Sequence, residues 1–388
     1  MNRLREEMAR DGTDLFIIYG DEYRRENLRY VSNYWPIFER GLLLVSRERD
    51  PVLLVSPECE HLAREMSPWG DIRLVRDVGM SYVPEEVDFT NIQFTTVADV
   101  VSELGRGKRP LSVKICGVDA MSSVLLDRLR GMLADATIHN GDGALYGMRR
   151  VKSPAEIAML AEAWRICDVG YKAVLDADLA GLTEIQAAAI GEKAARDAGA
   201  EHIVFSVFGS GARTNTVVGR PTRKVIRKGD MIMYSLAVQY EGYIASNEWP
   251  FVAGGKPTPQ QEQFIRHLVL AEDLGVKSVR AGVTQGEVVR KIRDYFRDNG
   301  LAAYDLYPPI HGNGLAEAES PYPDENTNEV FSAGIGINFD VSLFGHPEVG
   351  SNRIEEGFIV QENGLLALSR LIPSLREEYG GGKRRQRR

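Results

Sequence analysis

A helix start at residues 153–156 divides this chain more clearly than any other feature. Ser153 is followed by Pro154 and, three positions after the serine, by Glu156. This is the pattern of a capping box with proline at the first helical position. Apolar residues then recur at helical spacing, namely Ile157, Leu160, Ala161, Trp164 and Cys167. We therefore expect a long helix to open a second folding unit, and the 388 residues suffice for two domains.

Residues 1–147 alternate short apolar runs with helical stretches. Strands are expected at 15–19, 72–75, 111–115 and 136–138, and a helix at 97–104. The runs 41–45 and 51–55 flank the charged segment 46–50, which predicts a hairpin. These elements together indicate a small α/β domain.

Residues 148–375 are expected to form an α+β domain. Helices should follow the threonine caps Thr183, Thr258 and Thr284, and each should end at a glycine. Strand pairs are expected at 231–238 with 242–251, and at 334–343 with 353–361, which predicts an antiparallel sheet. Residues 376–388 carry a glycine run and then a basic run, and we expect a disordered basic tail there.

The charge and composition exclude several classes of partner. The net charge is −8 and the sequence pI is about 5.5, which disfavours nucleic acid or an anionic membrane as partner. No apolar run approaches the roughly 18 residues of a membrane span, and the charged N-terminus is unlike a signal peptide. The three cysteines are far apart in the sequence, so we expect no disulfide framework and a cytoplasmic location.

Five segments, in order, resemble the pita-bread catalytic domain of the creatinase/aminopeptidase P family. They are 149–157, 228–230, 240–243, 311–315 and 353–356. Residues 27–32 resemble part of the smaller N-terminal domain of that family. The resemblance implies a pita-bread fold preceded by a small α/β domain, a small-molecule substrate and a homodimer.

The resemblance also identifies where a metal centre would lie. Metal-dependent members hold two divalent cations with two Asp, one His and two Glu. The corresponding residues of this chain are Ser235, Ser246, His311, Asp340 and Glu355. Neutral hydroxyls therefore replace two anionic ligands, and hard cations prefer anionic oxygens. We expect no metal or other cofactor, although one weakly held ion stays open as an alternative.

Without a metal, the resemblance to creatinase suggests a different chemistry. His311 would transfer protons, because the ordinary pKa of histidine lies near neutrality. Glu248 aligns with a substrate-binding Glu of creatinases and would join Asp340 and Glu355 in the catalytic pocket. Crowded carboxylates repel, so either one is protonated or a cation binds. We expect a substrate bearing an amine, a guanidinium or a quaternary nitrogen; the alternative is that Arg353 neutralises the acids internally.

Five further residues are candidates for substrate binding. Ser235 and Ser246 would donate hydrogen bonds. Arg213 lies on a glycine-rich segment that is either a substrate clamp or a plain turn. Glu319 is either a pocket residue or a solvated loop acid, and Trp249 either walls the pocket or belongs to the core.

These features favour a creatinase-like, metal-independent hydrolase that cleaves a C–N bond of a small cationic molecule. Three alternatives stay open. The first is a residual metallopeptidase acting on an Xaa-Pro-like bond, which predicts bound metal and loss of activity on chelation. The second is a ligand-binding protein without turnover, and the third is a lyase acting on a small zwitterion.

Overall fold

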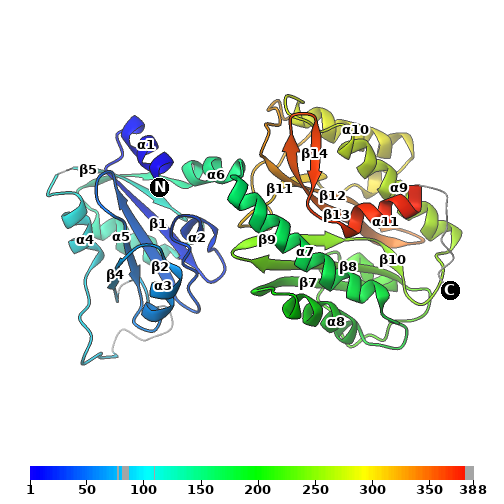
Figure 1. The fold of residues 1–388 in the computed structure, drawn as a ribbon, viewed down its shortest axis with the longest axis horizontal. Coiled ribbons are helices and arrows are strands. Elements are labelled where there is room, and N and C mark those ends of the chain that lie inside the picture. The colour runs from blue at the N-terminus through cyan, green and yellow to red at the C-terminus, as the bar shows by residue number, and fades with distance from the viewer. Residues whose placement is uncertain (77, 81–86, 109, 381–388) are drawn as a thin grey trace. The chain divides into compact units, whose positions relative to one another are not determined.

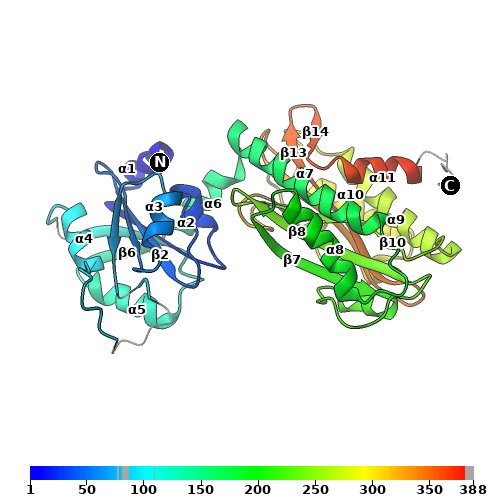
Figure 2. The ribbon, with the colours of Figure 1, turned by 60° about the horizontal axis from the view of Figure 1, so that its bottom comes forward.

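The computed structural model describes residues 1–76, 78–80, 87–108 and 110–380. The chain separates into two compact units, residues 1–149 and residues 150–388. Figures 1 and 2 show the elements of both units, and each unit is described by itself.

The first unit is built on a six-stranded sheet with the strand order β4-β3-β2-β1-β5-β6. The strands are β1 (Leu15–Asp21), β2 (Arg40–Ser46), β3 (Val52–Val55), β4 (Asp71–Leu74), β5 (Leu111–Cys116) and β6 (Ala136–Asn140). The helices are α1 (Asn2–Asp11), α2 (Glu26–Ser32), α3 (Glu60–Met66), α4 (Val97–Leu104), α5 (Ser123–Met132) and α6 (Asp142–Arg150). The expected hairpin is β2 with β3, which pair antiparallel.

The strands β1, β2 and β3 are buried on both faces, in keeping with their continuous apolar sequences. Along β1, Leu15 and Ile17 belong to one apolar cluster, whereas Phe16 and Ile18 belong to another. Successive side chains of a strand point to opposite faces, so the two clusters lie on the two sides of the sheet.

The second unit is built on an eight-stranded sheet with the order β10-β8-β9-β13-β12-β11, to which β7 adds at β8 and β14 at β13. The strands are β7 (His202–Ser210), β8 (Met231–Tyr240), β9 (Tyr243–Glu248), β10 (Phe251–Val252), β11 (Ile310–Gly312), β12 (Gly336–His346), β13 (Gly350–Gln361) and β14 (Gly364–Ala367). Their pairings are antiparallel. This arrangement confirms the expected α+β class for the second unit.

Helices cover this sheet. They are α7 (Pro154–Asp176), α8 (Glu184–Asp197), α9 (Pro259–Val276), α10 (Gln285–Asp298) and α11 (Leu371–Gly380), with short 3-10 turns η1 (Gly211–Thr216) and η2 (Ala302–Tyr304). The long helix predicted after Ser153 is α7, and its capping box is formed. Helices α7 and α8 pack on the β7–β9 part of the sheet, and α9 packs on β12 and β13 (Figures 1 and 2).

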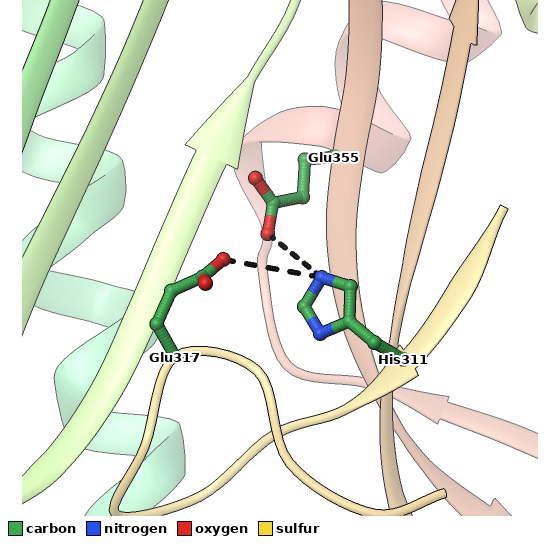
Figure 3. A group of neighbouring side chains, drawn as sticks. All are labelled: His311, Glu317 and Glu355. Carbon is green, nitrogen blue, oxygen red and sulfur yellow. Dashed lines mark ion pairs between the residues drawn. The ribbon is translucent and has the colours of Figure 1, made fainter. Parts of the chain in front are cut away.

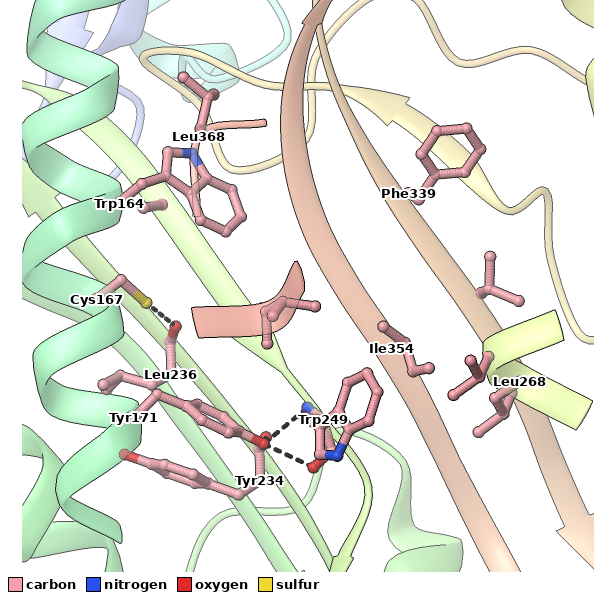
Figure 4. Packing of buried hydrophobic residues seen from close by; sticks show 14 of the residues in the cluster. Trp164, Cys167, Tyr171, Tyr234, Leu236, Trp249, Leu268, Phe339, Ile354 and Leu368 are labelled. Atoms are coloured by element: carbon pink, nitrogen blue, oxygen red, sulfur yellow. Dashed lines mark hydrogen bonds between the residues drawn. The ribbon is translucent and has the colours of Figure 1, made fainter. Parts of the chain in front are cut away.

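The α7–sheet contact forms the centre of the second core. Figure 4 shows Cys167 and Tyr171 of α7 against Tyr234 and Leu236 of β8. The Tyr171 hydroxyl also accepts a hydrogen bond from the Trp249 backbone N–H at 2.7 Å. This contact ties the end of β9 to the helix and so fixes the strand that carries Glu248.

The C-terminal helix differs from the sequence expectation. Residues 376–380 belong to α11 instead of to the expected disordered tail, because Arg376 pairs with the buried Glu272 and Glu356. The remainder of that tail, 381–388, lies outside the described residues. Within the described residues, no helix is long and apolar enough to cross a membrane.

Candidate active site

Four polar residues form one row across the second sheet. Ser235 on β8 lies opposite Glu248 on β9, which lies opposite Glu355 on β13, which lies opposite Asp340 on β12. Residues directly opposite one another in antiparallel strands project from the same face. All four are buried. The sheet therefore gathers three carboxylates that are far apart in the sequence.

His311 and Glu317 complete a second group beside Glu355. The His311 Nε2 atom lies 3.6 Å from Glu355 Oε1 and 3.9 Å from Glu317 Oε1 (Figure 3). The Nδ1 atom lies 3.0 Å from the Gly312 carbonyl oxygen, to which an Nδ1–H donates. That hydrogen bond fixes the ring and leaves Nε2 facing the two carboxylates.

The carboxylates of this group stabilise the charged form of His311, and charged His311 stabilises the carboxylate of Glu355 in turn. Burial opposes a charge on His311, but the contact with Glu355 and the charge of Glu317 outweigh it and raise the histidine pKa to about 10. Burial raises the pKa of Glu317 to about 7. Burial also opposes the charge of Glu355, yet its contacts with His311 hold the pKa of Glu355 below the ordinary value. The group therefore favours a cation between the two carboxylates, either a proton on His311 or a metal ion.

Arg353 neutralises the other two acids of the row. Its Nε–H donates to Glu248 Oε2 at 2.5 Å, and its Nη1 lies 3.5 Å from Asp340 Oδ2. Nη1 also donates to the Tyr307 hydroxyl at 2.7 Å, and that hydroxyl donates to Asp340 Oδ2 at 2.7 Å. Burial still raises the pKa of Glu248 to about 7, despite the guanidinium. Internal neutralisation by Arg353, the alternative left open above, is what the structure shows.

Glu355 is held by donors on both of its oxygens. The Ser246 hydroxyl donates to Oε2 at 2.9 Å, and the Asn338 side-chain amide donates to Oε1 at 2.8 Å. Asn313 in turn donates to the Asn338 side-chain oxygen at 2.6 Å. Ser246 therefore lies in the site, and the orientation of Glu355 is fixed by its neighbours.

Three residues that we expected in the pocket are engaged elsewhere, and we remove them from the site. The Arg213 Nε lies 3.0 Å from Glu184 Oε2, so its guanidinium forms an ion pair within the protein and not the substrate clamp that we expected. The Glu319 Oε1 lies 2.7 Å from Lys152 Nζ, and both side chains are buried. Trp249 is 2% exposed and packs within the core (Figure 4), as the alternative for it held.

Three residues of the site escaped the sequence interpretation: Glu317, Tyr307 and Asn338. Asn338 stands two positions before Asp340 on a strand, so its side chain lies on the same face, and that spacing could have identified it. Glu317 reaches His311 because the Gly312 and Glu319 backbones pair with each other and fold the intervening segment back. No spacing of residues in the sequence predicts that this segment folds back onto His311.

Comparison with known proteins identifies the family. Residues 158–362 match the family described as metallopeptidase family M24. Residues 1–151 match the creatinase/prolidase N-terminal domain. The chain belongs to metallopeptidase family M24. The expected family and pita-bread fold are thereby confirmed.

Several named proteins resemble this M24 protein. The uncharacterized peptidase YqhT of Bacillus subtilis is 28% identical over 60% of this chain and 66% of its own length. The Xaa-Pro dipeptidase of Pyrococcus horikoshii is 26% identical over 59% of this chain and 65% of its own. The chain thus matches slightly less than two thirds of the length of these two relatives.

Solved structures show the same fold. The prolidase from Pyrococcus horikoshii superposes with a TM-score of 0.80 at 22% identity, covering 95% of this chain and 97% of that one. The X-Pro aminopeptidase from Thermotoga maritima superposes with a TM-score of 0.81 at 22% identity, covering 95% and 96%.

The creatinase-like function inferred from the sequence is therefore wrong. The relatives carry the names of peptidases and Xaa-Pro dipeptidases, which favours the peptidase alternative. The physical basis of the error is Arg353. Because it pairs with Glu248 and Asp340, the acids do not require a cationic substrate to relieve their repulsion.

The donor set also bears on the metal that the family name implies. His311, Glu317 and Glu355 each offer a ligand atom, and these atoms lie within 4.8 Å of one another. One imidazole and two carboxylates suit a divalent ion such as zinc or manganese. The residues fit one metal ion at this point. We expected no metal because we counted ligands without Glu317, and Glu317 contributes an additional carboxylate.

Proposed function

We propose that this protein is a metallopeptidase that hydrolyses the Xaa-Pro bond of short peptides. The observation that carries the proposal is the close grouping of the buried His311 and Glu355 with the half-buried Glu317, whose ligand atoms can hold a divalent ion. Membership of the M24 family supports the reaction class. The names of the Xaa-Pro dipeptidase relatives supply the substrate class.

A divalent ion held by these three residues would polarise the scissile carbonyl and activate the attacking water. The residues of the chain have the remaining tasks. Asn338 and Ser246 orient Glu355 through its two oxygens. Glu248 stands beside Glu355 in the row, and its pKa of about 7 suits a group that holds or releases a proton at neutral pH.

Hydrolysis adds one water across the peptide bond, so the leaving nitrogen must gain a proton while the acyl carbon gains a hydroxyl. We assign the proton delivery to Glu248. Its Oε1 atom is buried and has no hydrogen-bond partner among the described residues, whereas Oε2 is held by Arg353. One oxygen is thus anchored and the other is available to a substrate.

Substrate would approach past Tyr322. The Tyr322 ring stacks on His311 with a centroid distance of 5.8 Å, and Tyr322 is 53% exposed while His311 is buried. This ring therefore lies between the histidine and solvent, where the apolar pyrrolidine ring of a proline residue could pack against it. The homodimer and the cytoplasmic location expected from the sequence also remain predictions of this proposal.

The test measures peptide hydrolysis and its dependence on metal. The full chain is stripped with a chelator, reloaded with Mn²⁺, Zn²⁺ or Co²⁺, and assayed on Ala-Pro, Met-Pro and Ala-Ala. We expect hydrolysis of the proline dipeptides only after reloading. Glu248→Gln should lower kcat by about 10²–10⁴-fold, the range for loss of a general acid or base.

His139→Ala is the control for the histidine substitution His311→Ala, because His139 is an exposed residue of the first unit. It should retain wild-type activity, whereas His311→Ala should lose it. The proposal fails if no dipeptide is hydrolysed with any of the three metals.

A further inference from the structure

Arg353 is a permanent cation among the acidic side chains of the site. It is 7% exposed and contacts Glu248, Asp340 and the Tyr307 hydroxyl. A guanidinium stays charged in proteins, so it neutralises these acids under all ordinary conditions. Unlike a bound ion, it cannot dissociate.

The four carboxylates of the pocket divide into two pairs, each with a separate cation position. Glu317 and Glu355 face His311 Nε2, where one metal ion fits. Glu248 and Asp340 face the Arg353 guanidinium. The two pairs are neighbours, because Glu248 and Asp340 flank Glu355 in the row, while Glu317 reaches His311 from a loop.

The residues that would have to bridge two ions carry no charge. Ser235 Oγ has no hydrogen-bond partner among the described residues, and Ser246 donates its hydroxyl proton to Glu355. A pair of divalent ions brings four positive charges close together and requires several anionic oxygens between them. Two neutral hydroxyls and a neighbouring guanidinium work against a second ion.

We propose that the Arg353 side chain takes the place of a second metal ion, so that the pocket binds one divalent ion at His311, Glu317 and Glu355. Asp340 is 6% exposed, and its Oδ1 has no partner among the described residues. Because Asp340 stands opposite Glu355, this oxygen is placed to provide further negative charge to the single ion. The inference rests on the metal site of the proposed function.

The experiment counts metal ions without measuring catalysis. The full chain is equilibrated with Mn²⁺ or Zn²⁺ by dialysis, and the metal content is measured by mass spectrometry. Electron paramagnetic resonance of the Mn²⁺-loaded protein reports whether two ions are spin-coupled. We expect one ion per chain and no coupled spectrum.

A triple variant, Ser235→Asp with Ser246→Asp and Arg353→Met, restores two carboxylates and removes the guanidinium. We expect it to bind two ions and to show a coupled Mn²⁺ spectrum. The double variant Ser235→Asp with Ser246→Asp is the matched control, since it restores the two carboxylates but keeps the Arg353 guanidinium beside Glu248 and Asp340. It should still bind one ion.

Two tightly bound ions in the wild type overturn this inference and leave the proposed peptidase standing. No bound ion overturns both this inference and the metal-dependent peptidase on which it rests. A folded triple variant that binds only one ion overturns the role given to Arg353. If the triple variant does not fold, the wild-type count and spectrum decide.

Discussion

Glu355 shows how the site is controlled at the scale of single residues. Its two oxygens accept hydrogen bonds from Ser246 and Asn338, and Asn313 orients Asn338 in turn. Partners of this kind fix the direction of a ligand and strengthen metal binding. The arrangement makes Asn338 a positioning residue, since its contact with Glu355 is what places the carboxylate beside His311.

Asn338→Ala should weaken metal binding by about 10–100-fold, the usual effect of losing such a partner. The measurement is the dissociation constant for Mn²⁺ by calorimetry. Asn247→Ala is the control, because Asn247 is also a buried asparagine but donates to Asp168 on α7. Equal losses of affinity in the two variants would contradict the positioning role of Asn338.

The sequence predicted part of this site for a clear reason. His311, Asp340 and Glu355 occupy motif positions whose strands are fixed by the fold, and Glu248 stands on a strand next to them. Glu317 was missed because it reaches the pocket from a loop. The role of Arg353 was only an open alternative, since its partners Glu248 and Asp340 come from two other strands. The register of neighbouring strands decides which side chains lie opposite one another, and the sequence alone did not predict that register.

At the scale of elements, α11 closes the second unit over a buried ion triad. Arg376 lies 3.0 Å from Glu272 on α9 and also pairs with Glu356 on β13. Both glutamates are fully buried. Burial, together with the charge of Glu272, raises the pKa of Glu356 to about 8, because one guanidinium serves two carboxylates.

Arg376→Met should destabilise the protein by about 3–5 kcal/mol, since it leaves buried carboxylates without a cation. The raised pKa of Glu356 determines the pH dependence. A folded state with a raised carboxyl pKa binds its proton more readily than the unfolded chain, so stability falls as the pH rises from about 4.5 through about 8. The free energy of unfolding that Arg376→Met loses should therefore be larger at pH 9 than at pH 6, as measured by urea unfolding.

The control adds Glu272→Gln and Glu356→Gln to Arg376→Met, which removes both acids together with their cation. This variant should recover much of the lost stability and lose the difference between pH 6 and pH 9. If this variant is as unstable as Arg376→Met alone, then α11 is held by packing and not by the ion pairs of Arg376.

The elements themselves were largely predictable, whereas the end of α11 was not. The capping box at Ser153 and the hairpin β2–β3 follow from local patterns, and both are formed. We expected the tail to begin at residue 376 because the glycines and basic residues that follow are typical of disorder, whereas α11 continues to Gly380. Arg376 lies before the glycine and basic runs. Its partners Glu272 and Glu356 are distant in sequence, so no local pattern indicates the ion pairs that hold this end of α11.

At the scale of the whole molecule, each unit has its own apolar core. One cluster of buried residues lies wholly within the second unit, from Leu160 to Ile372. Two other clusters lie wholly within the first unit. All residues assigned to the candidate site, from Ser235 to Glu355, also belong to the second unit. The second unit therefore contains both the core and the side chains that the proposed metal site requires.

Residues 150–388 expressed alone should fold and bind the same metal ion as the full chain. Circular dichroism should show one cooperative urea transition, with a smaller m-value than the full chain because less surface is exposed on unfolding. Trp164→Ala in this fragment should cost about 3–5 kcal/mol, because the side chain is fully buried against the sheet. A fragment that unfolds without cooperativity would show that the second unit depends on residues 1–149 for its fold.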